Sequence, residues 1–165
     1  MKKLLSILLS AFMLVMAFAC ETLQTQEDPQ DEQRPVQIEE FKKDTMPSQI
    51  KITVSGKTLP VSIENNEATK ALVAALRSAS ITYEASDYGG FEKVGPLGRS
   101  LPTSNSQITT QPGDVILYSG NQIVLFYGSN SWSYTRLGKI EYGTLDELKS
   151  FLKAGQGNIS VALSL

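Results

Sequence analysis

Residues 113–140 carry the strongest β-strand pattern in the chain and constrain its fold more than any other stretch. Two apolar runs, 115–118 and 122–127, flank residues 119–121, which have the sequence Ser-Gly-Asn. Glycine and asparagine tolerate the positive φ angles that hairpin turns require, so the two runs are expected to form a tight hairpin. A third strand is predicted over residues 134–140. The fold is therefore expected to be built around antiparallel β-structure.

The flanking sequence predicts further strands on both sides of this hairpin. Alternating apolar residues predict an opening hairpin over residues 50–63 and a final strand over 159–165 that must pair inside the sheet. A short strand is expected over residues 81–84, followed by a loop over 86–90. The segment 91–102, FEKVGPLGRSLP, combines glycines and prolines with apolar and charged residues, so it is expected to fold over the core without forming a simple strand.

Two helices complete the predicted domain. Asn65 is predicted to cap a helix that runs to about Ala79, because small apolar residues recur there at helical spacing. Thr144 and Glu147 have the spacing of a capping box, which predicts a second helix with an apolar face. The total of about eight strands and two helices places the domain in the mainly β class.

The first 20 residues have the form of a secretory signal peptide, with Lys2 and Lys3 before an apolar run. That run has about fifteen residues, fewer than the roughly 20 that a membrane-spanning helix needs, although an uncleaved anchor is the alternative. The sequence Ala-Phe-Ala before Cys20 resembles a bacterial lipobox. We therefore expect lipidation of Cys20, with the membrane as a partner, and localisation as an exported lipoprotein of the bacterial cell envelope.

Residues 21–47 differ in composition from the domain at 48–165. They hold eight acidic and three basic residues and few large apolar side chains. Such a segment cannot bury enough surface to offset the entropy of ordering, so we predict a disordered acidic tether.

Several chemistries are excluded by the residues that the chain lacks. The sequence has no histidine and only one cysteine, Cys20. Ser-His and Cys-His catalysis, His/Cys zinc sites and an internal disulfide are therefore excluded. No glycine-rich phosphate loop, acidic metal cluster or basic face is present, so we expect no cofactor, no metal and no nucleic acid partner.

Four segments together resemble the bacterial cyclophilin-like domain family. They are GDVILYSGNQIVLFYG, NSWSYTRLGKI, FEKVGPLGRSLP and NNEATKALVAAL. The resemblance covers about residues 50–163 and implies a closed β-barrel of about eight strands with two flanking helices. Cyclophilins catalyse prolyl isomerisation with an arginine and neighbouring apolar, Gln, Trp and His residues. This chain has no histidine, and neither of the arginines 99 and 136 aligns by motif with the catalytic one.

Candidate ligand-binding residues come from the hairpin region and from the irregular segment before it. We expect Trp132, in a polar loop at 128–133, either to cover the barrel or to stack on a ligand. Arg136 should point away from the core if Leu137 points into it. The candidates for a ligand site at the barrel mouth are Trp132, Tyr134, Arg136, Arg99, Glu92 and Phe126.

The arginines and aromatic residues among these candidates are compatible with more than one function. Arg99 is expected to pair with Glu92 or Asp114, or else to bind a ligand. An aromatic mouth with one arginine suits an apolar peptide or a small anionic ligand. The favoured hypothesis is a non-catalytic envelope module that binds such a ligand. The alternatives are a weak peptidyl-prolyl isomerase and a structural domain with no ligand.

Overall fold

The computed structural model describes residues 45–165 of the chain, so the signal peptide at 1–20 and most of the tether at 21–47 lie outside the described residues. Within residues 45–165, the structure contains nine strands and two helices. In chain order these are β1 Gln49–Val54, β2 Lys57–Ile63, α1 Glu67–Ser78, β3 Ile81–Tyr88, β4 Glu92–Pro96, β5 Ser106–Thr109, β6 Asp114–Tyr118, β7 Gln122–Phe126, β8 Ser131–Ile140, α2 Leu145–Phe151 and β9 Ile159–Ser164. None of the helices in this part of the chain is long and apolar enough to cross a membrane.

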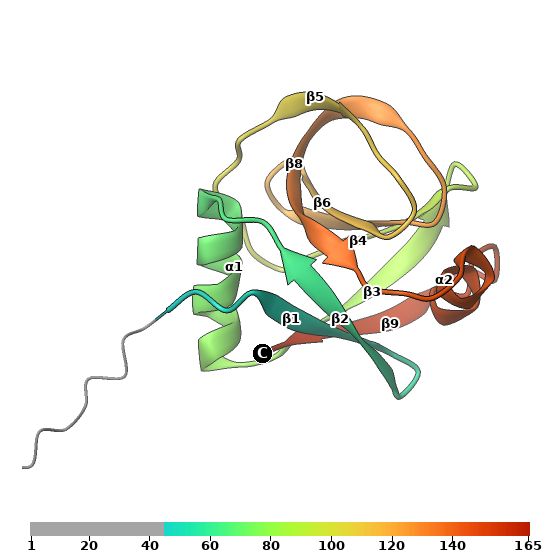
Figure 1. Cartoon of the computed structure of the whole chain (residues 1–165), viewed down its shortest axis with the longest axis horizontal. Helices are drawn as coiled ribbons and strands as arrows, with labels where there is room; N and C mark the ends of the chain where they lie inside the picture. Colours follow the sequence, from blue (N-terminus) through green and yellow to red (C-terminus); the bar gives the residue numbers. More distant parts are fainter. Residues whose placement is uncertain (1–44) are drawn as a thin grey trace, which may run out of the picture. The chain divides into compact units, whose positions relative to one another are not determined.

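Eight of the strands close into an antiparallel barrel (Figure 1). Their order around the barrel is β2-β1-β9-β3-β4-β7-β6-β8, and pairing of β2 with β8 closes the ring. The ninth strand, β5, pairs only with β8 and lies outside the ring. The predicted mainly β fold, a closed barrel of about eight strands with two helices, is thus confirmed. The final strand β9 pairs with both β1 and β3, so it lies inside the sheet as expected.

The barrel closes where β2 and β8 approach each other closely at Gly138. Ile63 and Gly138 are partners across this seam. A Cβ atom at Gly138 would lie 2.2 Å from the carbonyl oxygen of Ser62, which is closer than non-bonded atoms approach. Glycine is therefore required for the two backbones to pair at this position.

Both helices begin at side-chain caps and bury one face in the barrel core. α1 is capped by Asn66, whose side chain accepts a hydrogen bond from the backbone N–H of Thr69, so the prediction of Asn65 as the cap was wrong by one residue. The predicted capping box of Thr144 and Glu147 is present at α2. Figure 1 shows the two helices on opposite sides of the barrel.

Three strands extend beyond or contradict the predicted boundaries. β3 continues to Tyr88 through the predicted loop at 86–90, and β4 forms a regular strand inside the segment expected to be irregular. The prolines and glycines of that segment do not break β4, because Pro96 is its last residue and Gly95 allows close approach of the Glu84 carbonyl. β8 begins at Ser131, so Trp132 lies in a strand paired with β5 and not in a polar loop.

The pleat of the barrel wall separates two apolar clusters. Ile123 and Leu125 of β7 belong to the main core, whereas Val124 and Phe126 belong to a second, smaller cluster. Since successive residues of a strand point to opposite faces, the second cluster lies on the outer face of the barrel wall. Ile116 of β6 and Tyr134 of β8 complete its buried part. This outer cluster forms the base of the candidate site.

Candidate functional site

A pocket of about 400 Å³ lies on the outer cluster, across β4, β6, β7 and β8. Val94 and Val124 form an apolar part of its lining. Its position differs from the expected one, because it lies on the outer face of the barrel wall and not at the barrel mouth. The volume is within the range of roughly 300 to 1,000 Å³ that is typical of small-molecule sites.

Four aromatic side chains line the pocket: Tyr88, Tyr118, Trp132 and Tyr134. The rings of Tyr118 and Tyr134 meet edge to face, with centroids 6.0 Å apart. Tyr134 is buried, whereas Trp132 is 56% exposed and Tyr88 is 64% exposed. The pocket therefore combines a fixed aromatic base with large rings that remain accessible to a ligand.

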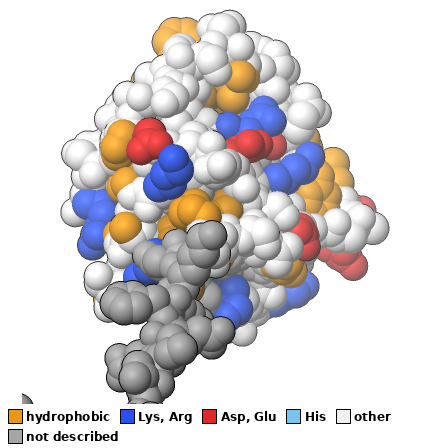
Figure 2. Space-filling model, turned by 60° about the vertical axis from the view of Figure 1, so that its left-hand side comes forward, with side chains coloured by type: hydrophobic (Ala, Val, Ile, Leu, Met, Phe, Trp, Pro, Cys, Tyr) orange, Lys and Arg blue, Asp and Glu red, His pale blue; other side chains and the backbone are white. Residues whose placement is uncertain are grey.

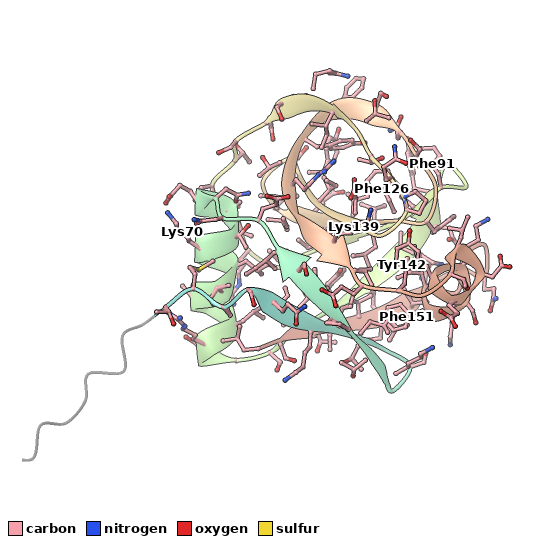
Figure 3. The ribbon with its side chains drawn as sticks, viewed as in Figure 1. Lys70, Phe91, Phe126, Lys139, Tyr142 and Phe151 are labelled. Atoms are coloured by element: carbon pink, nitrogen blue, oxygen red, sulfur yellow. The ribbon has the colours of Figure 1, made fainter. Side chains whose placement is uncertain are left out.

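Phe126, another candidate for the ligand site, lies beneath this lining. It is fully buried, packs edge to face on Tyr134 at 5.9 Å and stacks on Phe91 at 6.2 Å. Figure 3 shows Phe91 and Phe126 beside each other in the barrel wall. Phe126 supports the pocket but does not line it.

Glu92 places a carboxyl group in this apolar setting. Its side chain lines the pocket and the residue is only 6% exposed. The Oε2 atom of Glu92 has no hydrogen-bond partner within the described part of the chain. Burial raises the pKa of Glu92 to about 7, because the charged form loses its hydration. A buried, unpartnered carboxyl is an uncommon feature in a folded protein and marks a candidate site.

The neighbour of Glu92 in sequence cannot neutralise it. Lys93 is fully buried on the opposite face of β4, where its Nζ lies 2.8 Å from Oδ2 of Asp87 and also donates to the carbonyl of Gly157. Because adjacent strand residues point to opposite faces, the Lys93 ammonium is directed away from the pocket. Glu92 and Lys93 therefore place their charged groups on opposite faces of the barrel wall.

Asn130 fixes the polar edge of the pocket. Its backbone N–H donates to Oγ1 of Thr110 at 2.9 Å, and its carbonyl accepts from the backbone N–H of Thr110 at 2.8 Å. Its side-chain Nδ2 donates to the hydroxyl of Tyr134 at 3.0 Å. The position of Tyr134 is thus set by a hydrogen bond as well as by packing. Gln122, also in the lining, adds a second amide.

The two candidate arginines do not line the pocket. Arg136 does lie on the face opposite the core residue Leu137, as expected, but its Nη2 is 3.1 Å from Oδ2 of the buried Asp114. Arg99 is exposed, and the structure gives it no hydrogen bond or ion pair among residues 45–165. The predicted pairing of Arg99 with Glu92 or Asp114 was therefore wrong. Neither arginine is therefore placed to contact an anionic ligand in this pocket.

The structure thus brings together three of the six predicted residues, Glu92, Trp132 and Tyr134, as pocket lining. Sequence reasoning missed Tyr88, because it was assigned to a loop, and Tyr118, although alternation within the predicted hairpin places it on the face opposite Leu117. The lining residues Gln122 and Asn130 carried no sequence signal of their own.

The charged side chains outside the pocket are distributed without a concentration of one sign on the face shown in Figure 2. Among residues 45–165, no group of three or more Asp, Glu, Cys or His side chains could hold a metal ion. Figure 2 shows Lys and Arg side chains interspersed with Asp and Glu over one face of the molecule, without a broad surface of one sign.

The chain belongs to the Cyclophilin-like family, whose model matches residues 52–164. Among solved structures, it is similar to a hypothetical protein from Archaeoglobus fulgidus, with 16% identity, a TM-score of 0.52 and coverage of 75% of this chain and 98% of that chain. It is also similar to McbB, determined in complex with tryptophan, with 13% identity, a TM-score of 0.50 and coverage of 70% of this chain and 44% of McbB. At these identities the two structures show a shared fold alone. No curated protein matches the chain.

Proposed function

We propose that this cyclophilin-like domain binds a small organic ligand, or a side chain of a peptide, in the pocket on the outer face of its barrel. The observation that supports the proposal is the buried Glu92 carboxyl with an unpartnered Oε2, among four aromatic side chains. Leaving a buried polar atom without a partner costs roughly 1 to 3 kcal/mol, so a site that retains one is suited to a ligand that supplies the missing hydrogen bond.

The proposal includes the location of the domain. Acyl chains on Cys20 would anchor the mature protein in the bacterial cell envelope, with the acidic segment after Cys20 as a tether. The domain would then bind its ligand outside the cytoplasm. This part of the proposal is supported by the sequence before residue 45.

Prolyl isomerisation is not favoured as an alternative. Neither Arg99 nor Arg136 lines the pocket, and the chain has no histidine. Rotation about the prolyl bond has a barrier of about 18 to 20 kcal/mol, and no lining side chain of this pocket carries a positive charge to hydrogen-bond the twisting amide. The geometry therefore favours ligand recognition over prolyl isomerisation.

A ligand screen with a pocket-filling variant tests the proposal. Trp132 is the only tryptophan of the chain, so its fluorescence reports directly on the pocket. We expect compounds from a screen of small amines, acids and neutral aromatic molecules to change this emission in the wild type. Val94→Phe should fill the pocket and abolish the response. Thr82→Phe adds the same ring to an exposed position of β3 that does not line the pocket, and it should leave binding intact.

The measurement is informative only if both variants fold, which circular dichroism and thermal unfolding establish. A screen without any compound whose binding depends on the open pocket would contradict the proposed function. Binding that survives Val94→Phe unchanged would place the ligand elsewhere on the domain.

A further inference from the structure

The pocket contains an acid without a counter-charge. Glu92 is the one ionisable carboxyl among its lining residues, and no lysine or arginine lines it. A buried carboxylate is strongly disfavoured unless a positive charge or several hydrogen bonds compensate it. Within the described residues, nothing supplies a hydrogen bond to Oε2. Glu92 therefore either holds a proton or requires a donor beyond residues 45–165, and a bound ligand can supply that donor.

The cations on the neighbouring strands are already engaged. Lys93 is held by Asp87 on the inner face of β4, and Arg136 is held by Asp114 at the start of β6. Each cation is thus held by a carboxylate of its own, and drawing it to Glu92 would require breaking that pair.

The walls of the pocket favour a cation as well. Tryptophan and tyrosine attract cations to their ring faces, and the attraction reaches about 2 kcal/mol or more where the cation is desolvated. Trp132, Tyr118 and Tyr134 lie around the same space as the Glu92 carboxyl. Aromatic rings and a carboxylate together select for positive charge, whereas an anionic ligand would be repelled by Glu92.

We infer that the ligand of this pocket carries an organic ammonium group with at least one N–H, which donates to Oε2 of Glu92 while the aromatic side chains surround the attached carbon frame. The inference rests on the proposed function and specifies its ligand class. An N–H is required because a fully substituted ammonium could not satisfy the unpartnered oxygen. Gln122 and Asn130 add side-chain amides to the same lining.

Three probes of similar shape and different charge test this inference on the purified full chain. They are 2-phenylethylammonium, 2-phenylethanol and phenylacetate, with affinities measured by calorimetry and by Trp132 fluorescence. We expect the ammonium probe to bind at least about tenfold more tightly than the alcohol, and phenylacetate to bind most weakly.

Two variants assign the preference to Glu92. Glu92→Gln keeps the shape of the side chain and removes its charge, so it should weaken binding of the ammonium probe by about tenfold and leave binding of the alcohol unchanged. Glu84→Gln removes the same charge from an exposed position of β3 and should change neither affinity.

The possible failures are distinguishable. If the alcohol or phenylacetate binds as tightly as the ammonium probe, or if Glu92→Gln leaves the affinities unchanged, the ammonium inference is overturned and the pocket remains a ligand site. The same conclusion follows if none of the three probes binds while other compounds bind in a manner that Val94→Phe abolishes. If no compound binds to the open pocket, both proposals fail.

Discussion

The Nζ atom of Lys93 lies 2.8 Å from Oδ2 of Asp87, and this half-buried ion pair joins β4 to β3. Asp87 also accepts hydrogen bonds from the hydroxyl of Tyr127 at 2.9 Å and from the backbone N–H groups of Gly155 at 3.0 Å and Gly157 at 2.9 Å. The carboxylate thus connects β3 with β4, with the end of β7 and with the turn before β9.

The first prediction concerns the coupling of this pair. Asp87→Asn should destabilise the domain by about 3 to 5 kcal/mol, because it leaves the ammonium of Lys93 buried without a counter-charge. Lys93→Met should cost less, since Asp87 keeps three other donors. The double variant should lose less stability than the sum of the two single variants, measured by urea unfolding. Additive losses would show that the two side chains do not interact energetically.

A second prediction concerns the stability of the domain at low pH. Burial alone would raise the pKa of Asp87, but the hydrogen bonds from Lys93, Gly155, Gly157 and Tyr127 lower it to about 2. A carboxyl whose pKa is lowered in the folded state stabilises that state above its ordinary pKa of 3.8 and loses this contribution as the pH falls towards 2. At about 1.4 kcal/mol per pKa unit, roughly 2 kcal/mol should be lost over this range in the wild type. The stability difference between wild type and Asp87→Asn should narrow there. A constant difference would contradict the lowered pKa.

A third prediction concerns Glu92, for which stability should change with pH in the opposite direction. The pKa of Glu92 is raised from 4.5 to about 7, so the folded state binds a proton that the unfolded state has released at intermediate pH. Stability should therefore fall as the pH rises from 4.5 to 7, and then level off. Glu92→Gln should remove this decrease and be about 1 to 3 kcal/mol more stable than wild type at alkaline pH. Thermal unfolding across this range checks it, with Glu84→Gln as the control for general charge effects. A wild-type profile that remains after Glu92→Gln would assign the titration to another group.

A fourth prediction concerns the N-terminus. Cys20→Ala should release the protein from the membrane fraction and abolish incorporation of labelled fatty acid, because the acyl chains are expected on this residue and each buried methylene contributes about 0.8 kcal/mol. A chain that stays in the membrane at its uncleaved size would indicate a signal anchor. Unchanged partitioning without fatty acid in the wild type would contradict lipidation.

The segment with Glu92 and Lys93 shows what the sequence could predict of the site and what it could not. β1 was predicted because its apolar residues recur every second position, and β7 because it is a continuous apolar run after a turn. β4 was not predicted, because its residues show no apolar alternation. Glu92 and Val94 lie on its outer face, and Lys93 and Gly95 lie on its inner face. β4 is a strand because it pairs with β3 and β7, and the local sequence of β4 does not reveal this pairing. Without the strand, Glu92 and Lys93 could not be assigned to opposite faces.

The same limit applies to the partners of the arginines. Arg136 was correctly placed on the outer face from alternation with Leu137. Its partner Asp114 is separated from it by 22 positions and follows from the pairing of β6 with β8, which includes an irregular register between Val115 and Ile116. Local pattern can assign a face, but an ion pair across strands depends on register, and one irregular position changes which side chains meet.

The last prediction concerns the seam that closes the barrel. Gly138→Ala should destabilise the domain by about 1 to 3 kcal/mol, because the added methyl group would have to displace the backbone of β2. The contact is 2.2 Å to the carbonyl oxygen of Ser62, and backbone in a paired strand cannot give way as a flexible side chain can. Lys139→Ala, at the exposed next residue of β8, should change stability by no more than about 0.5 kcal/mol. Urea unfolding followed by the emission of Trp132, which lies on the same strand, measures both variants. Equal stability of Gly138→Ala and wild type would mean that the pairing of β2 with β8 tolerates a wider spacing, and that closure of the ring contributes little to the stability of the domain.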